Sequence, residues 1–152
     1  MKKSILDFRR MKETGEKITW LTGYDYLTAK YEEKAGVEMI LVGDSLGMVQ
    51  LGYETTYPVT MDDMVIHTAS VRRGAPNTFI VGDMPYMSYQ TSDEDAVFNA
   101  GRLTKEALCD AVKLEGGGEE ICKRISAIAS VGILVLGHIG LTPQFAAQMG
   151  GY

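Results

Sequence analysis

A chain of 152 residues is long enough to form one ordinary domain with a real hydrophobic core. Its 45% hydrophobic and 23% charged residues are typical of a soluble globular protein, and a net charge of −5 without a basic patch argues against nucleic-acid binding. No apolar run reaches the roughly 20 residues of a membrane helix, and the start, MKKSILDFRRMKETG, lacks the apolar segment of a signal peptide. Cys109 and Cys122 form no metal-binding or paired-cysteine pattern, so we expect reduced, packed thiols and a cytoplasmic protein.

Five short apolar runs recur along the chain, rich in β-branched residues and mostly without alternation. They lie at residues 18–22, 39–43, 78–82, 110–114 and 132–137. Such runs are typical of strands that are covered on both faces, as in a parallel sheet. We therefore predict five parallel strands.

Helical patterns separate these runs. Thr60 with Asp63 resembles a capping box before one helix, and Ser92 with Asp95 another. Ser4 is suited to cap an additional first helix at about residues 4–14. The remaining helical segments are 26–35 and 119–129. Strands that alternate with helices indicate right-handed βαβ units.

Such units build either a doubly wound sheet or part of a (β/α)8 barrel. The GxGxxG turn of dinucleotide-binding doubly wound sheets is absent after the first strand. Acidic residues instead fall at or just past the ends of four strands: Asp25, Asp44, Asp83 and Glu115. Barrel enzymes gather their catalytic groups from several strand ends at one face. We therefore predict an α/β fold of the (β/α)8 TIM-barrel type, here reduced to about five of its strands.

Asp44 and Asp83 stand in matching contexts, Val-Gly-Asp-Ser and Val-Gly-Asp-Met. Two carboxylates that converge at a barrel mouth repel each other unless a cation or a proton lies between them, and Mg²⁺ prefers such oxygen ligands. Glu115 would add a third carboxylate, directly or through water. Lys113, two residues away on the same face of a strand, would then neutralise the carboxylate of a substrate that reaches the metal.

Each of these residues also has a structural interpretation. Strand-end aspartates often cap the next helix or fix a turn, and a Lys/Glu pair two residues apart often forms only an ion pair. Ser45 would donate to a substrate oxygen or merely satisfy the loop backbone. His67, within a predicted helix, is interpreted as structural, whereas His138 would either face the site or cap a helix. The Met and Tyr residues of DMPYMSYQ are interpreted as core and loop packing.

Several segments carry a resemblance that covers the chain in order from about residue 5 to its last residue. They are ITWLTGYDY, ILVGDSLGMVQLGYETTYPVTMDDMVIHTASVRRGA, FIVGDMPYMSYQ, AVKLEGG and GHIGLTPQ with GGY, and the DSLGM and KLEGG blocks are highly specific. Together they resemble the ketopantoate hydroxymethyltransferase family. The resemblance implies a Mg²⁺-dependent barrel of the phosphoenolpyruvate/pyruvate type, whose members include enzymes that act on 2-oxo acids.

The resemblance also implies a reaction and its site. A hydroxymethyl group would pass from 5,10-methylenetetrahydrofolate to 3-methyl-2-oxobutanoate, through a Mg²⁺-stabilised enolate, to give ketopantoate for pantothenate and coenzyme A. By position, Asp44 and Asp83 would bind Mg²⁺, with Glu115 in its shell. The residues that contact the oxo acid would be Asp44, Ser45, Asp83 and Lys113. The family resemblance further suggests a large, ring-built homo-oligomer.

The chain departs from the family pattern at two places. Leu108 and Cys109 replace small residues before the fourth strand, which would crowd the turn there without touching the site. The chain also stops after GGY, where the family continues and carries, on its sixth strand, the glutamate that serves as general base. A barrel needs eight strands and typically about 250 residues. We therefore expect a partial barrel without a catalytic base of its own.

Three interpretations stay open from the sequence. The first is the N-terminal part of a hydroxymethyltransferase that is active when the missing part is supplied. The second is an inactive fragment that keeps metal and oxo-acid binding or only associates with a partner chain. The third is a related Mg²⁺ barrel acting on phosphoenolpyruvate or isocitrate, and the intact DSLGM and KLEGG blocks argue against it.

Overall fold

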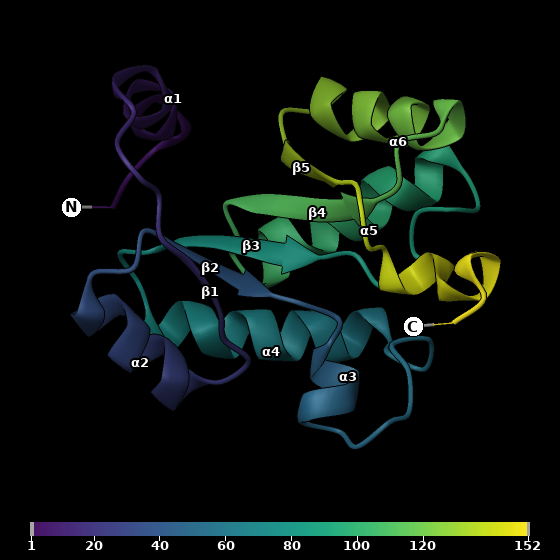
Figure 1. Ribbon diagram of the computed structural model, residues 1–152, viewed down its shortest axis with the longest axis horizontal. Helices are drawn as coiled ribbons and strands as arrows, with labels where there is room; N and C mark the ends of the chain where they lie inside the picture. The colour runs from purple at the N-terminus through teal and green to yellow at the C-terminus, as the bar shows by residue number, and fades with distance from the viewer. Residues whose placement is uncertain (1, 152) are drawn as a thin grey trace.

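The computed structural model describes residues 2–151, which form a sheet of five parallel strands. The strands are β1 (Trp20–Thr22), β2 (Met39–Val42), β3 (Phe79–Asp83), β4 (Ala111–Glu115) and β5 (Leu134–His138). They lie in the order β1-β2-β3-β4-β5 (Figure 1). This consecutive order is that of a (β/α)8 barrel, whereas a doubly wound sheet reverses its order at a switch point. The predicted barrel topology is confirmed, and every strand lies within two residues of its predicted bounds.

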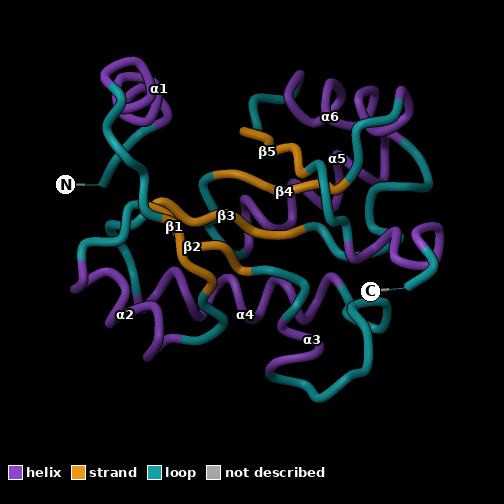
Figure 2. Tube along the Cα trace, viewed as in Figure 1, coloured by secondary structure: helices purple, strands orange, loops and turns teal. Residues whose placement is uncertain are grey.

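The helices are α1 (Ile5–Thr14), α2 (Tyr26–Ala35), α3 (Leu46–Val49), α4 (Met61–Gly74), α5 (Asp93–Glu106), α6 (Glu119–Ser130) and the 3₁₀ segment η1 (Pro143–Met149). Of these, α2, α4, α5 and α6 connect successive strands and cover one face of the sheet (Figure 2). The sequence did not predict α3 and η1, which lack the length that makes a helical period visible. Among residues 2–151, no helix is long and apolar enough to cross a membrane.

The two predicted capping boxes lie at the starts of α4 and α5, and the second differs from the prediction in one hydrogen bond. Thr60 and Asp63 form the full capping box of α4, with Asp63 N–H donating to Thr60 Oγ1 at 3.1 Å and Thr60 N–H donating to Asp63 Oδ2 at 3.0 Å. Ser92 Oγ accepts from Asp95 N–H at 3.0 Å at the start of α5. The carboxylate of Asp95, however, accepts from the Thr91 hydroxyl at 2.6 Å, so the second half of this capping box is formed by the preceding residue.

Helix α1 closes the end of the sheet from which the strands start (Figure 1). Its buried side chains, Phe8 and Met11, pack in a cluster with residues of the inner sheet face: Met39, Phe79, Val81 and Ala111. The rings of Phe8 and Phe79 meet edge to face, with centroids 5.1 Å apart. Burying such a phenylalanine contributes about 1.5–3 kcal/mol. The inner face is therefore apolar and closed at the amino ends of the strands, which leaves the carboxyl ends for polar groups.

The turn before β4 carries Leu108 and Cys109, the two residues that we expected to crowd it. Leu108 has a φ of 57°, in the left-handed region, and its side chain is exposed. Cys109 is buried, and neither residue lines the cavity described below. The turn therefore avoids crowding by directing Leu108 outwards, at the cost of a strained backbone. Cys109 and Cys122 are both free, as predicted, but Cys122 is exposed on α6, so its predicted packing is wrong.

Candidate active site

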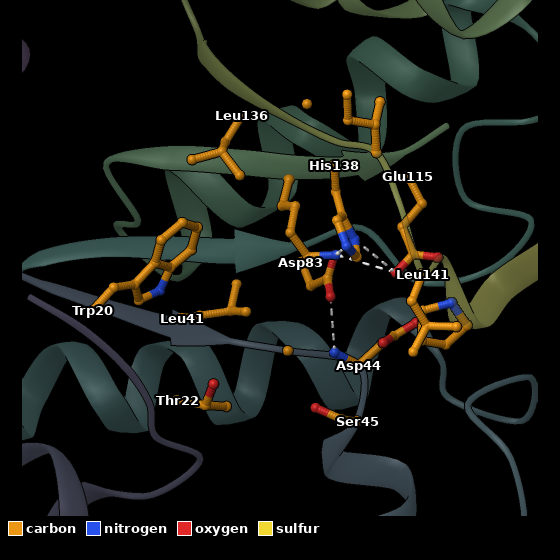
Figure 3. Close-up of a pocket in the computed structure, with 15 residues that line it drawn as sticks. Trp20, Thr22, Leu41, Asp44, Ser45, Asp83, Glu115, Leu136, His138 and Leu141 are labelled. Carbon is orange, nitrogen blue, oxygen red and sulfur yellow. Dashed lines mark hydrogen bonds and ion pairs between the residues drawn. The ribbon is translucent and has the colours of Figure 1, made fainter. Parts of the chain in front are cut away.

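The carboxyl ends of β2, β3 and β4 bring the charged residues of the predicted site together (Figure 3). Asp83 is the last residue of β3 and lies beside Lys113 in the strand register. Glu115 is the last residue of β4 and lies beside His138 of β5. Asp44 follows the end of β2. Because alternate residues of a strand share a face, Lys113 and Glu115 both point inwards, as their spacing predicted.

These side chains line a cavity of about 610 Å³ with two different ends. Trp20, Leu41 and Leu136 form an apolar end, and the charged residues gather at the other (Figure 3). Ser45 and His138 also line the cavity, so His138 faces the site, which was one of its two interpretations. The charged side chains at the polar end are almost fully buried: Asp44 is 3% exposed, Asp83 1%, Lys113 5% and Glu115 1%. Charges buried to this degree need a counter-charge or a metal.

Lys113 supplies the positive charge of this cluster. Its Nζ lies 3.0 Å from Asp83 Oδ1 and 3.3 Å from Glu115 Oε1. Burial disfavours the charged ammonium, but the attraction of Asp83 and Glu115 is stronger, so the pKa of Lys113 is raised. Lys113 is therefore charged at neutral pH. The ion pair between Lys113 and Glu115 that the sequence allowed is present, and Lys113 also pairs with Asp83.

Burial disfavours the ionised forms of Asp83 and Asp44. Burial raises the pKa of Asp83 to about 7, although the attraction of Lys113 partly opposes this, and burial also raises the pKa of Asp44. Asp83 Oδ2 accepts from Asp44 N–H at 3.1 Å. Asp83 Oδ1 is buried, and its partner is Lys113 Nζ at 3.0 Å; no other donor among residues 2–151 reaches this oxygen. The two carboxylates thus lack part of the compensation that buried charges require.

Glu115 has partners at both of its oxygens. Oε1 lies 3.3 Å from both Lys113 Nζ and His138 Nδ1, and Oε2 accepts from Gln144 N–H at 3.0 Å. Within residues 2–151, no three His, Cys, Asp or Glu side chains are grouped as a metal site by themselves.

The donor set still fits a Mg²⁺ ion shared by Asp44 and Asp83. Mg²⁺ is usually held by one or two protein carboxylates, with water and substrate oxygens as its other ligands. The buried Oδ1 of Asp83, whose near partner is the Lys113 ammonium, is a carboxylate oxygen of the required kind. Three carboxylates and one ammonium carry a formal charge of −2 when all are ionised, which a divalent cation would balance.

Two other residues considered from the sequence lie outside this cluster. Asp25 is the N-cap of α2, and its Oδ1 accepts from two backbone N–H groups of the first turn at 2.8 and 2.9 Å. Hydrogen bonds from that turn lower the pKa of Asp25. His67 Nδ1 lies 2.7 Å from the carbonyl oxygen of Tyr24. The structural interpretation is therefore correct for both Asp25 and His67.

Three polar contacts of the site were missed by the sequence reasoning. Gln144 Nε2 donates to Asp44 Oδ2 at 2.8 Å, and Tyr89 is a fully buried residue whose hydroxyl accepts from Glu115 N–H at 3.1 Å. The hydroxyl of Tyr24 lies 2.9 Å from Ser45 Oγ. All three residues lie in segments that also carry the family resemblance, so the signal was their position in those segments and not their residue type.

Comparison with curated proteins gives close relatives. The chain is 60% identical over 151 residues to 3-methyl-2-oxobutanoate hydroxymethyltransferase of Alkaliphilus metalliredigens, covering 99% of this chain and 53% of that protein. It is 57% identical over 152 residues to the enzyme of the same name from Desulfotalea psychrophila, covering 100% of this chain and 54% of that protein. The chain therefore spans about half the length of the curated relatives it matches.

Solved structures support the fold. A 2,3-dimethylmalate lyase of the PEP mutase/isocitrate lyase superfamily superposes with a TM-score of 0.70 at 18% identity, over 100% of this chain and 55% of that one. A phosphonopyruvate hydrolase in complex with oxalate and Mg²⁺ superposes with a TM-score of 0.72 at 13% identity, over 87% of this chain and 50% of that one. At these identities the likeness shows the fold alone, an α/β barrel fold.

The sequence model of one family covers nearly the whole chain. It is described as ketopantoate hydroxymethyltransferase and matches residues 2–152. With relatives of that name at 55–60% identity, the sequence resemblance is confirmed. The chain belongs to the ketopantoate hydroxymethyltransferase family.

Proposed function

We propose that this chain forms the metal- and oxo-acid-binding part of a 3-methyl-2-oxobutanoate hydroxymethyltransferase. The reaction would transfer a hydroxymethyl group from 5,10-methylenetetrahydrofolate to 3-methyl-2-oxobutanoate and give 2-dehydropantoate for pantothenate biosynthesis. The observation that carries the proposal is the buried cluster of three carboxylates and one lysine at adjacent strand ends, in a chain of this family. The activity of the whole enzyme is part of the proposal, because the chain spans about half the length of its relatives.

Asp44 and Asp83 would hold Mg²⁺, and Glu115 would act on it through water. When bound, Mg²⁺ would polarise the 2-oxo group of the substrate and favour loss of the proton at C3. The protein's own contribution is to fix the two carboxylates before the ion arrives. The Asp44 N–H orients Asp83 at 3.1 Å, so one ligand positions the other. Preorganised ligands avoid the free-energy cost of ordering side chains during binding.

Lys113 and Ser45 would contact the substrate. In the metal-free cluster Lys113 Nζ pairs with Asp83 and Glu115. With Asp83 engaged as a metal ligand, the Lys113 ammonium would be free to attract the substrate carboxylate. Ser45 Oγ lines the cavity and would donate to a substrate oxygen, with Tyr24 OH as its other partner. The apolar end of the cavity suits the branched hydrocarbon part of 3-methyl-2-oxobutanoate.

The proton at C3 also needs a base. Lys113 is charged, and we assign Asp44, Asp83 and Glu115 to the metal, so none of these four residues serves as the base in this proposal. The proposed base is the glutamate that the family resemblance implies on a sixth strand, which is not among the five strands that the structure describes. Supplying the C-terminal part of a relative as a separate chain would restore turnover if this assignment is right.

The metal site is tested by calorimetric titration of Mn²⁺ or Mg²⁺ in the presence of 3-methyl-2-oxobutanoate. The parent chain should bind the metal, and Asp44→Asn with Asp83→Asn should abolish binding. Asp25→Asn is the matched control, because Asp25 is also a strand-end aspartate but caps a helix outside the cavity. Equal metal affinity in the double variant would refute the assignment.

Lys113→Ala tests the substrate contact separately. Loss of a charged partner should weaken 3-methyl-2-oxobutanoate binding by about 2 kcal/mol. The single tryptophan, Trp20, lines the cavity and offers a fluorescence signal for this titration. If the oxo acid binds the variant as well as the parent, Lys113 is only the ion-pair partner of Asp83 and Glu115.

A further inference from the structure

Gln144 connects the three strand ends of the candidate active site. It lies in the first turn of η1, which folds back over the carboxyl ends of β3 and β4 (Figure 1), and it is 2% exposed. Its Nε2 donates to Asp44 Oδ2 at 2.8 Å and to the Met84 carbonyl oxygen at 2.9 Å. Its backbone N–H donates to Glu115 Oε2 at 3.0 Å. One residue therefore holds a carboxylate that follows β2 and a carboxylate that ends β4.

The contacts of the Gln144 amide also fix its orientation. Oε1 accepts from Tyr89 OH at 2.7 Å and from Gln90 Nε2 at 3.1 Å. A flipped amide would place Oε1 against two acceptors, the Asp44 carboxylate and the Met84 carbonyl, and would place Nε2 against the Gln90 amide N–H. Only one orientation satisfies all four groups, and in it Gln144 donates to Asp44.

We propose that Gln144 is a positioning residue for the metal-binding carboxylates, with Tyr89 as its support. This inference rests on the proposed function, since it concerns the same site. A neutral amide can hold the Asp44 carboxylate in place without cancelling its charge, whereas a lysine or arginine there would compete with the cation. Gln144 thus fixes Asp44 for a divalent ion and keeps the negative charge that attracts it.

Tyr89 extends the same connection to Glu115. Its side chain is 0% exposed, and its hydroxyl donates to Gln144 Oε1 and accepts from Glu115 N–H at 3.1 Å. The hydroxyl therefore orients the Gln144 amide and ties the end of β4 to it. Residues that hydrogen-bond to metal ligands typically alter metal affinity by about 10–100-fold when they are replaced.

The experiment measures Mn²⁺ affinity by electron paramagnetic resonance, with 3-methyl-2-oxobutanoate at a fixed concentration. Gln144→Met keeps the length of the side chain and the backbone contact to Glu115 but removes the donor to Asp44. Tyr89→Phe removes only the hydroxyl. Ile128→Val is the control: Ile128 is fully buried in the core on α6 and does not line the cavity. Urea unfolding of each variant reports its stability.

We expect Mn²⁺ binding to be about 10–100-fold weaker in Gln144→Met and also weaker in Tyr89→Phe. The control Ile128→Val should bind Mn²⁺ as tightly as the parent, even where urea unfolding shows that it has lost as much stability as the site variants. Unchanged affinity in both site variants would overturn the inference and leave the metal site intact. A parent chain that binds no Mn²⁺ would instead refute the metal site itself. If Gln144→Met does not fold, Tyr89→Phe decides the question by the same criterion.

Discussion

Asp83→Asn should stabilise the metal-free chain at alkaline pH, because the buried Asp83 carboxylate destabilises the folded state when it is ionised. Burial raises the pKa of Asp83 from 3.8 to about 7. This is about three pKa units at about 1.4 kcal/mol each, so the ionised carboxylate costs the folded chain about 4 kcal/mol. The attraction of Lys113 is already contained in this pKa. Asparagine has nearly the same shape and cannot ionise, so it avoids this cost.

The sign of the pH dependence follows from proton binding. The folded chain holds the Asp83 proton more tightly than the unfolded chain, so the parent loses stability as the pH rises from about 4 to above 7. The difference in unfolding free energy between Asp83→Asn and the parent should therefore grow from near zero at pH 4 to about 4 kcal/mol at pH 8. Taking the difference between the two proteins removes the contribution of the titrating groups that do not interact with Asp83.

Urea unfolding at both pH values, followed by circular dichroism and Trp20 fluorescence, measures this difference. Asp25→Asn is a control of opposite sign, because hydrogen bonds lower the pKa of Asp25, so its carboxylate stabilises the fold above its unfolded pKa. That variant should lose stability at pH 8. Addition of Mg²⁺ with the oxo acid should narrow the gap for Asp83→Asn, since only the parent gains from binding. A variant no more stable than the parent at pH 8 would refute the reasoning.

Three further predictions concern the rest of the chain. Leu108→Gly should raise the unfolding free energy by about 1 kcal/mol in urea, because φ is 57° and the side chain is exposed; a loss of stability would show that the leucine makes a needed contact. Burial raises the pKa of Cys109 to about 11, so a disulfide reagent should modify Cys122 rapidly and Cys109 only on unfolding, and two fast thiols would contradict this. Among the described residues β1 and β5 each pair on one side only, so the 152-residue chain should self-associate in light scattering, and a monodisperse monomer would count against open edges.

Periodicity and capping signals predicted most of the fold and the central part of the site. Residues at the ends of parallel strands share one edge of the sheet whatever the loops do, so Asp83, Lys113 and Glu115 could be placed together from their positions alone. Asp25 obeys the same rule and yet caps α2, because the first turn offers its carboxylate two backbone N–H groups at once. A position at a strand end therefore identifies candidate site residues. The hydrogen-bond donors near each side chain then determine whether it joins the site or caps a helix.

The contacts of Gln144 could not be predicted in this way. It lies 100 residues from Asp44, and it reaches the site through a short 3₁₀ segment without a periodic signal. The residue type of a glutamine that follows a proline does not indicate which groups it will contact. What selects its contacts is the need of buried donors and acceptors for partners, which becomes visible only when the strand ends have been assembled.

The need of buried polar groups for partners also explains why the amino and carboxyl ends of the strands are built differently. The cluster of Asp44, Asp83 and Glu115 would push the strand ends apart if nothing opposed it. At the opposite end of the same face, α1 covers the amino ends of the strands with an apolar cluster around Phe8 and Phe79, which holds the strands together there. Lys113 and the amide of Gln144 then restrain the carboxylates without neutralising them all. A site built in this way keeps the negative charge that a divalent cation requires, while the rigid strand ends keep its oxygens in place before any ion binds.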